Sequence, residues 1–106
     1  MLIITTPAIE GHRITRYLGM VGAETIMVAN IFKDFRAGVR NVVGGRNEPY
    51  ENEVRKARDL ALAEMAEQAH MLGANAIVGA ALDFETLGRD GGMLMVCATG
   101  TAVVYE

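Results

Sequence analysis

The chain has 106 residues, of which 51% are hydrophobic and 22% are charged, and its formal net charge is −3. A chain of this length buries enough surface to fold without a metal or a disulfide. Its net negative charge gives no bulk electrostatic support for a nucleic-acid partner. Its one cysteine excludes an internal disulfide and favours a reducing compartment.

The first residues contain neither a basic leader nor an apolar run long enough for a signal peptide. No later segment has the length and hydropathy needed to span a bilayer. We therefore expect a single domain over residues 1–106, a cytoplasmic location and no membrane partner.

The N-terminal region is expected to be mostly extended. Residues 2–6 predict a short strand ended by Pro7, and residues 10–13 predict a turn. Residues 14–28 predict a longer extended region. Because glycines inside a strand mark bends or bulges, Gly19 and Gly22 indicate one bent strand or two short ones.

Asn30 is a suitable N-cap for a short helix that stops at the pair Gly44 and Gly45 and precedes a longer helix described below. One side of this helix is apolar, and the other carries the only concentrated positive charge of an acidic chain. Arginine forks and free backbone N–H groups suit phosphate or carboxylate, so this segment is a candidate anion site. The candidate site consists of Lys33, Arg36, Arg40, Gly44, Gly45 and Arg46. The alternative is an ordinary charged helix face whose arginines pair with nearby acids; Arg55, Lys56 and Arg58 have the same two interpretations.

Residues 51–72 predict the long helix around which the fold is organised, with a stop at Gly73. Its apolar residues recur at steps of three and four, which places them in one buried stripe. Most of them are alanine, so the helix axis can lie close to whatever covers it. The stripe consists of Val54, Ala57, Ala61, Met65, Ala69 and Leu72.

Residues 76–84 predict a central strand, residues 89–92 a hairpin turn, and residues 93–105 the last strand. The fold is therefore α+β, with a sheet packed by one long and one short helix. Strict alternation would place Ala76, Val78, Ala80, Leu82 and Phe84 on one side of the central strand and Ile77, Gly79 and Ala81 on the other. Neither face of the closing strands is properly polar. Because an antiparallel sheet with one wet face alternates cleanly, we expect a homo-oligomer that covers the second face.

Several short segments, spread in order over nearly the whole chain, closely resemble the YbjQ family of small bacterial and archaeal proteins. They are residues 30–32, 44–46, 50–51, 55–58, 73–79 and 100–103. The resemblance implies a dodecin-like subunit and a ring-shaped homo-oligomer, a pentamer. The family's label is heavy-metal binding, and it has no established activity.

The residues can be tested against that label. Soft metals bind thiolate and thioether sulfur, and zinc binds four closely grouped ligands. The chain has no Cys-x-x-Cys, and His12 and His70 are far apart in sequence. The best local candidate is Met93-x-Met95-x-Cys97, whose period of two places three sulfur atoms along one strand face, where they could hold a soft ion such as Cu(I).

Each metal candidate also has a structural interpretation. Methionine and free cysteine commonly fill irregular cores or interfaces, and a buried mid-strand cysteine is inert. His70 suits a helix C-terminus, and His12 suits a solvated turn. Asp83 and Glu85, on one strand face, could bind a hard cation or act as acid and base, but a strand leaving the core also explains them.

No phosphate-binding loop or nucleophile elbow is present, so we expect no enzyme. Two hypotheses from different classes remain. The first is a ring-forming module that binds a metal ion or a small anion at a subunit boundary. The second is an interaction scaffold without a ligand. The family label favours the first.

Overall fold

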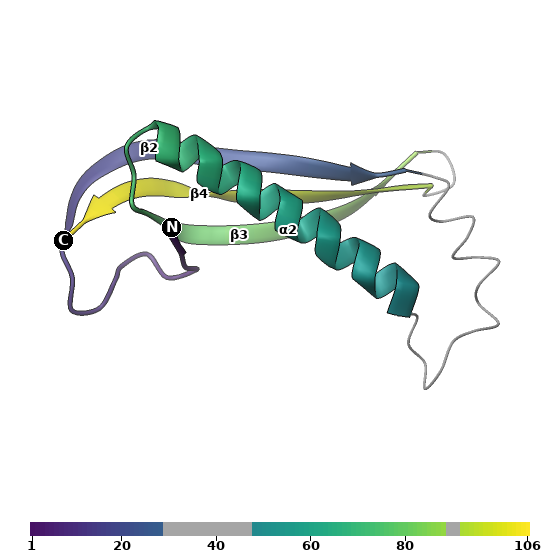
Figure 1. Ribbon diagram of the computed structural model, residues 1–106, viewed down its shortest axis with the longest axis horizontal. Coiled ribbons are helices and arrows are strands. Elements are labelled where there is room, and N and C mark those ends of the chain that lie inside the picture. Colours follow the sequence, from purple (N-terminus) through teal and green to yellow (C-terminus); the bar gives the residue numbers. More distant parts are fainter. Residues whose placement is uncertain (29–47, 89–91) are drawn as a thin grey trace.

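The computed structural model describes residues 1–28, 48–88 and 92–106. A four-stranded mixed sheet lies against one long helix, which confirms the α+β class (Figure 1). The expected short helix from Asn30 lies outside the described residues. The elements are β1 (Leu2–Ile3), β2 (Ile14–Met27), α2 (Glu48–Met71), β3 (Ala76–Leu87) and β4 (Met93–Tyr105).

The strand order in the sheet is β1-β3-β4-β2. Strand β4 is antiparallel to β3 on one side and to β2 on the other, and β1 pairs in parallel with the start of β3. Pairing of Leu87 with Met93 confirms the predicted hairpin, although its turn residues 89–91 lie outside the description. The expected bent strand is also present, because β2 is one strand with irregular pairing between Tyr17 and Gly19.

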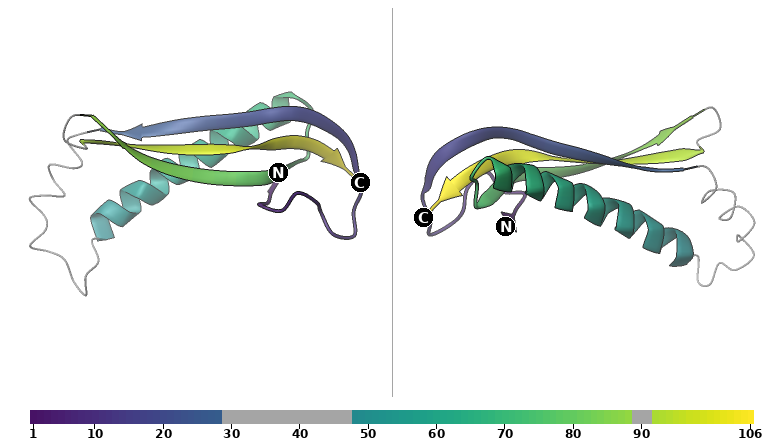
Figure 2. Two further views of the ribbon diagram at one scale, coloured as in Figure 1. Left: turned by 180° about the vertical axis from the view of Figure 1, so that it is seen from behind. Right: turned by 45° about the horizontal axis from the view of Figure 1, so that its top comes forward.

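Helix α2 crosses one face of the sheet obliquely and packs mainly on β2 and β4 (Figure 2). Its buried residues are Ala57, Ala61, Met65 and Ala69, as the spacing predicts. Leu72 was wrongly assigned to this stripe: it is half exposed, because the helix ends at Met71 and the chain then turns. The small alanine side chains let the helix approach Val96 and Ala98 of β4 closely.

The helix stops at Gly73, as predicted, through a specific pair of backbone bonds. Gly73 has a φ of 90°, which a residue with a Cβ adopts only with strain. Its N–H donates to the carbonyl of His70 at 3.0 Å, and the N–H of Ala74 donates to the carbonyl of Ala69 at 3.0 Å. This Schellman arrangement satisfies two of the last helical carbonyls and turns the chain into β3.

A bulge in β3 overturns the expected alternation of that strand. Register with β4 jumps between Val78 and Ala81, and Gly79 has a φ of 59°. The extra residue reverses which face the later side chains occupy. Consequently Leu82 and Phe84 lie on the α2 side with Ile77, rather than with Ala76 and Val78 as strict alternation predicted.

Among the described residues, the other face of the sheet is covered only near the chain ends. There Ile4, Ile9 and Ile14 pack on Ala76, Val78 and Val103 in a small second core. Beyond the bulge, no other described element packs on this face. We call this uncovered part the open face; it consists of Glu24 and Ile26 of β2, Ala81, Asp83 and Glu85 of β3, and Met93, Met95 and Cys97 of β4.

Candidate functional site

The three candidate sulfur ligands lie in a column on the open face, along the middle strand of the sheet. Met93, Met95 and Cys97 are each partly exposed, whereas Leu94 and Val96 between them are buried under α2. The expectation that Cys97 is buried is therefore wrong for the single chain, in which this residue is partly exposed. Cys97 is a free cysteine of intermediate exposure.

The spacing of the column limits how it can hold an ion. Residues two apart in a strand are separated by about 6.8 Å. Two sulfur ligands of one ion, each about 2.3 Å from it, can lie at most about 4.6 Å apart. Met95 and Cys97 can meet this limit only if their side chains lean towards each other. The unbranched methionine side chain has the rotatable bonds for this movement.

Carboxylates flank the sulfur column on both sides. Cys97 lies opposite Asp83 of β3 and also opposite Glu24 of β2, and Met95 lies opposite Glu85. Directly opposite residues have Cβ atoms about 5 Å apart, closer than neighbours along one strand face. The sequence indicated Asp83 and Glu85 but missed Glu24. Only the pairing register places Glu24 beside Cys97, and no local motif signals it.

These side chains do not converge on one point within a single copy. Among the described residues, no three histidine, cysteine, aspartate or glutamate side chains are grouped closely enough to hold a metal ion. A zinc-type site made only of such ligands is therefore absent from the described part of one chain. An ion on the open face would need thioether sulfur or groups from another copy.

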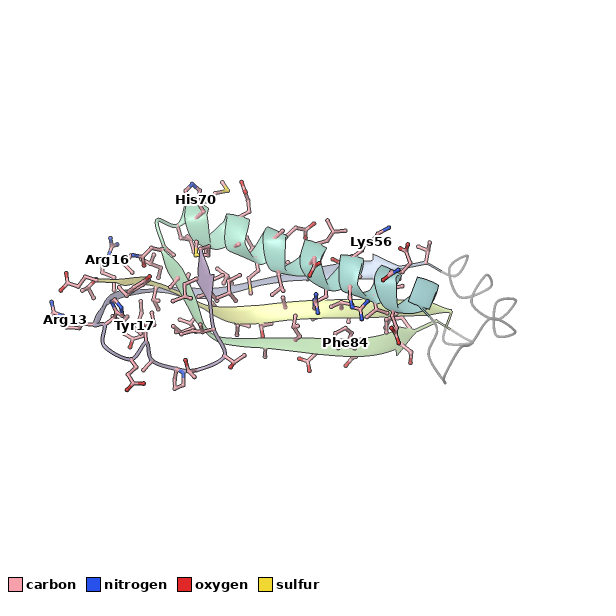
Figure 3. The ribbon with its side chains drawn as sticks, turned by 60° about the horizontal axis from the view of Figure 1, so that its bottom comes forward. Arg13, Arg16, Tyr17, Lys56, His70 and Phe84 are labelled. Carbon is pink, nitrogen blue, oxygen red and sulfur yellow. The ribbon has the colours of Figure 1, made fainter. Side chains whose placement is uncertain are left out.

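The two histidines lie outside this face. His12 packs edge-on against Tyr105, with ring centroids 5.2 Å apart, and its Nδ1 is 3.2 Å from the carbonyl oxygen of Glu106. His70 is exposed in the last turn of α2 (Figure 3). There it lines a hollow together with Glu67 and Asn75. Neither histidine extends the sulfur column.

The basic groups of the long helix have acidic neighbours. Arg58 contacts Asp59 at 3.0 Å, Lys56 contacts Glu53 at 3.4 Å, and Arg55 contacts Glu51 at 3.7 Å. Pairing with nearby acids therefore accounts for Arg55, Lys56 and Arg58. The predicted anion site, Lys33, Arg36, Arg40, Gly44, Gly45 and Arg46, lies entirely outside the described residues.

The described parts of the chain define a small α+β protein whose sheet carries a helix on one face and a sulfur column between carboxylates on the other. The chain belongs to the YbjQ family: a family model described as "Putative heavy-metal-binding" matches residues 1–106. The crystal structure of a protein of unknown function from the DUF74 family of Pediococcus pentosaceus ATCC 25745 has a similar fold. The two structures superpose with a TM-score of 0.66, and the two sequences are 17% identical. The match covers 100% of this chain and 98% of the other chain. None of the described helices combines the length and hydropathy required to cross a membrane.

Proposed function

We propose that this protein is a homo-oligomeric binding module that holds a soft metal ion on the open face. Met93, Met95 and Cys97 supply the sulfur ligands. The observation that carries the proposal is that all three are partly exposed on one strand face that no other described element covers. The description of the family supports the same class of ligand.

The donor set favours Cu(I) over harder ions. Thioether and thiolate sulfur select soft cations, whereas carboxylate and water suit magnesium or calcium. The flanking carboxylates add negative charge near a bound cation without converging on it. A binding role of this kind requires no catalytic step, and we propose none.

The proposed oligomer is the dodecin-like ring, a pentamer, that the family resemblance implies. Its support is the apolar surface exposed on the single chain, including Leu82, Phe84 and Ile26 at the borders of the sheet. Monomeric proteins rarely expose contiguous apolar patches of large size. The same surface also favours the alternative, a scaffold whose only ligand is another copy of the chain.

A competition titration tests metal binding. Apo-protein is titrated with Cu(I) under reducing, anaerobic conditions in the presence of a chromophoric Cu(I) chelator. We expect the protein to withdraw Cu(I) from the chelator, and the double variant Met93→Leu, Met95→Leu and the variant Cys97→Ser each to weaken this at least tenfold. Met71→Leu is the matched control, because Met71 is exposed at the end of α2, away from the open face.

Native mass spectrometry of the same samples provides the oligomer number and the stoichiometry of bound copper. A wild-type protein that takes no Cu(I), or variants that bind as tightly as Met71→Leu, would refute the sulfur column as the site. An intact oligomer in that case would leave the scaffold as the explanation of the exposed surface.

A further inference from the structure

Two strand edges lack partners in the described parts of the chain, and they lie on opposite borders of the sheet. The N-terminal segment follows β3 only to Ala80, whose N–H bonds to the carbonyl of Ile4 at 2.9 Å. From Ala81 to Leu87 the outer edge of β3 has no described backbone partner. On the other border, the outer edge of β2 has one described partner, the side chain of Gln68 at Gly22.

The first half of the β2 edge is protected against strand pairing. Its register is irregular between Ile14 and Arg16 and again between Tyr17 and Gly19, and Gln68 occupies Gly22. Bulges and covering side chains are the usual means of blocking an edge. Among the described residues, the regular stretches of edge that nothing blocks are therefore 23–27 of β2 and 81–87 of β3, which flank the same part of β4.

Exposed apolar side chains mark both unblocked stretches. Ile26 of β2 is 49% exposed, Val28 directly after β2 is 54% exposed, and Phe84 of β3 is 48% exposed. Phe84 lies on β3 clear of α2 (Figure 3). A strand edge that is regular, unblocked and apolar is a site for pairing with another strand.

At each free edge, the residues whose backbone N–H and C=O groups point away from the sheet carry their side chains on one face, and this face differs between the two edges. In an antiparallel pair, backbone groups alternate between the partner and the outside. Since the N–H and C=O of Gly22 point outwards to Gln68, those of Glu24 and Ile26 do as well, and their side chains lie on the open face.

The same alternation applies across β4. The backbone groups of Ala98 point to Ala23 of β2, so those of the preceding residue, Cys97, point to Asp83 of β3. The backbone groups of Asp83 therefore point to β4, and those of Leu82 and Phe84 point outwards. Their side chains lie on the α2 side.

This arrangement fixes the direction in which the two edges can join. In antiparallel pairing, two residues that exchange backbone hydrogen bonds carry their side chains on the same face of the sheet. In parallel pairing, a residue bonds to the two neighbours of the residue opposite it, so the bonded residues of the two strands carry their side chains on opposite faces. Only parallel pairing therefore joins β3 to β2 in one continuous sheet with all helices on one side. The strands already have this direction, because both are antiparallel to β4.

We propose that β3 of one copy pairs in parallel, through residues 81–87, with residues 23–27 of β2 of the next copy. The proposal rests on the oligomer of the proposed function and states how its copies join. The contact is head-to-tail, so it repeats from copy to copy instead of ending at a dimer, and it forms a ring where the rotation between copies closes.

The junction adds a residue to the metal-binding face. Glu24 of the neighbouring copy comes to lie beside Asp83 and Glu85, which in turn lie beside Cys97 and Met95. Carboxylates of two copies then lie side by side on this face, with Glu24 of the neighbouring copy two strands, about 9.6 Å, from the sulfur column.

Engineered cysteines test this junction in the full chain. In a Cys97→Ser background, Glu24→Cys is combined with Asp83→Cys or with Glu85→Cys, to allow for either register. Within one chain, these positions are separated by β4, about 9.6 Å from strand to strand. That exceeds the Cα separation of about 7 Å that a disulfide tolerates, so a bond can form only between copies.

After oxidation we expect at least one double variant to give a covalent ladder, from dimers up to the closed ring, on a non-reducing gel. Each single variant should remain uncrosslinked, and so should Glu24→Cys combined with Glu67→Cys on the exposed side of α2. Dimers alone from Asp83→Cys would show β3 pairing with β3 and would overturn the proposal. An oligomer that gives no ladder with either double variant would also overturn it.

Native mass measurement of each variant separates this result from failure of the proposed function. A monomeric wild-type chain refutes the oligomer and the junction together, while an oligomer without crosslinks refutes the junction alone. Hydrogen exchange of the unmodified protein is the second measurement, in case the variants fail to assemble. The amides of Glu24, Ile26, Leu82 and Phe84 should exchange at least a hundredfold more slowly than free amides, and fast exchange at these positions would refute the junction.

Discussion

The side-chain amide of Gln68 on α2 forms two hydrogen bonds with the backbone of Gly22 on β2. Its Nε2 donates to the Gly22 carbonyl at 2.7 Å, and its Oε1 accepts from the Gly22 N–H at 3.2 Å. The amide thus takes the position that a neighbouring strand would occupy, and it fixes the end of the helix to the edge of the sheet.

Replacing Gln68 with alanine should therefore destabilise the fold. Two hydrogen bonds of ordinary strength predict a loss of about 1–2 kcal/mol in the free energy of unfolding, measured by urea titration. Gln68→Glu should be at least as damaging, because its carboxylate oxygen would face the Gly22 carbonyl without a donor. Glu64→Ala, an exposed change on the same helix, is the control. Equal stability of Gln68→Ala and Glu64→Ala would contradict the proposed role.

Asn75 holds the end of β4 in the same manner. Its Nδ2 donates to the carbonyl of Tyr105 at 2.9 Å, and its Oδ1 accepts from the Tyr105 N–H at 2.9 Å. We expect Asn75→Ala to lower the free energy of unfolding by about 1–3 kcal/mol. Asn75→Asp keeps the acceptor and loses the donor, so it should be destabilised in a neutral buffer as well. A melting temperature unchanged in both variants would rule out this role.

Gly100 is required for close packing between β4 and β3. A Cβ at this position would overlap Cγ2 of Ile77 and would lie 3.4 Å from the carbonyl oxygen of Val78. Overpacking of this kind predicts that Gly100→Ala costs about 1–3 kcal/mol. In a double-mutant cycle, Ile77→Ala should recover part of this loss, because it removes the overlapping methyl group. Strict additivity of the two changes would place the cost of Gly100→Ala elsewhere.

The sequence was sufficient to predict the long helix, because its alanine-rich stripe has a clear period of 3.6 and Gly73 provides a stop. It was also sufficient for the alternation along β4. It could not predict the faces of β3, since a bulge at Gly79 depends on hydrogen bonds to Thr6 and Ile4 that no local pattern indicates. Leu72 was mistakenly included in the buried stripe of the helix for a similar reason, because the last residue of a helix depends on its capping geometry.

The candidate site was predictable in part. The period of two placed Met93, Met95 and Cys97 on one face. The register that brings Glu24 opposite Cys97 is a long-range property of strand pairing, so inspection of either strand alone could not reveal it. Exposure of Cys97 depends on which elements cover the open face, and that is likewise a tertiary property.

Accessibility of Cys97 leads to a prediction about its chemistry. The thiol of the apo-protein should react with iodoacetamide under native conditions, because Cys97 is partly exposed. Bound Cu(I) should slow this alkylation at least tenfold, since a coordinated thiolate is no longer free to attack. Mass spectrometry of the intact protein measures both rates. Protection that persists in the double variant Met93→Leu, Met95→Leu would show that the thioethers do not contribute to the site.

Phe84 and Leu60 provide a matched test of the surface used for assembly. Both are large apolar residues that are about half exposed on the single chain, Phe84 at 48% and Leu60 at 55%. Phe84 lies on β3, the strand whose outer edge lacks a described partner beyond Ala80, whereas Leu60 lies on the exposed side of α2. Burying an aromatic side chain at an interface contributes about 1.5–3 kcal/mol, so Phe84→Ser should raise the dissociation constant of each contact about tenfold or more. Leu60→Ser should leave it unchanged. Sedimentation velocity over a range of concentrations measures both, and equal weakening by the two variants would mean that assembly uses the helix surface as much as the β3 edge.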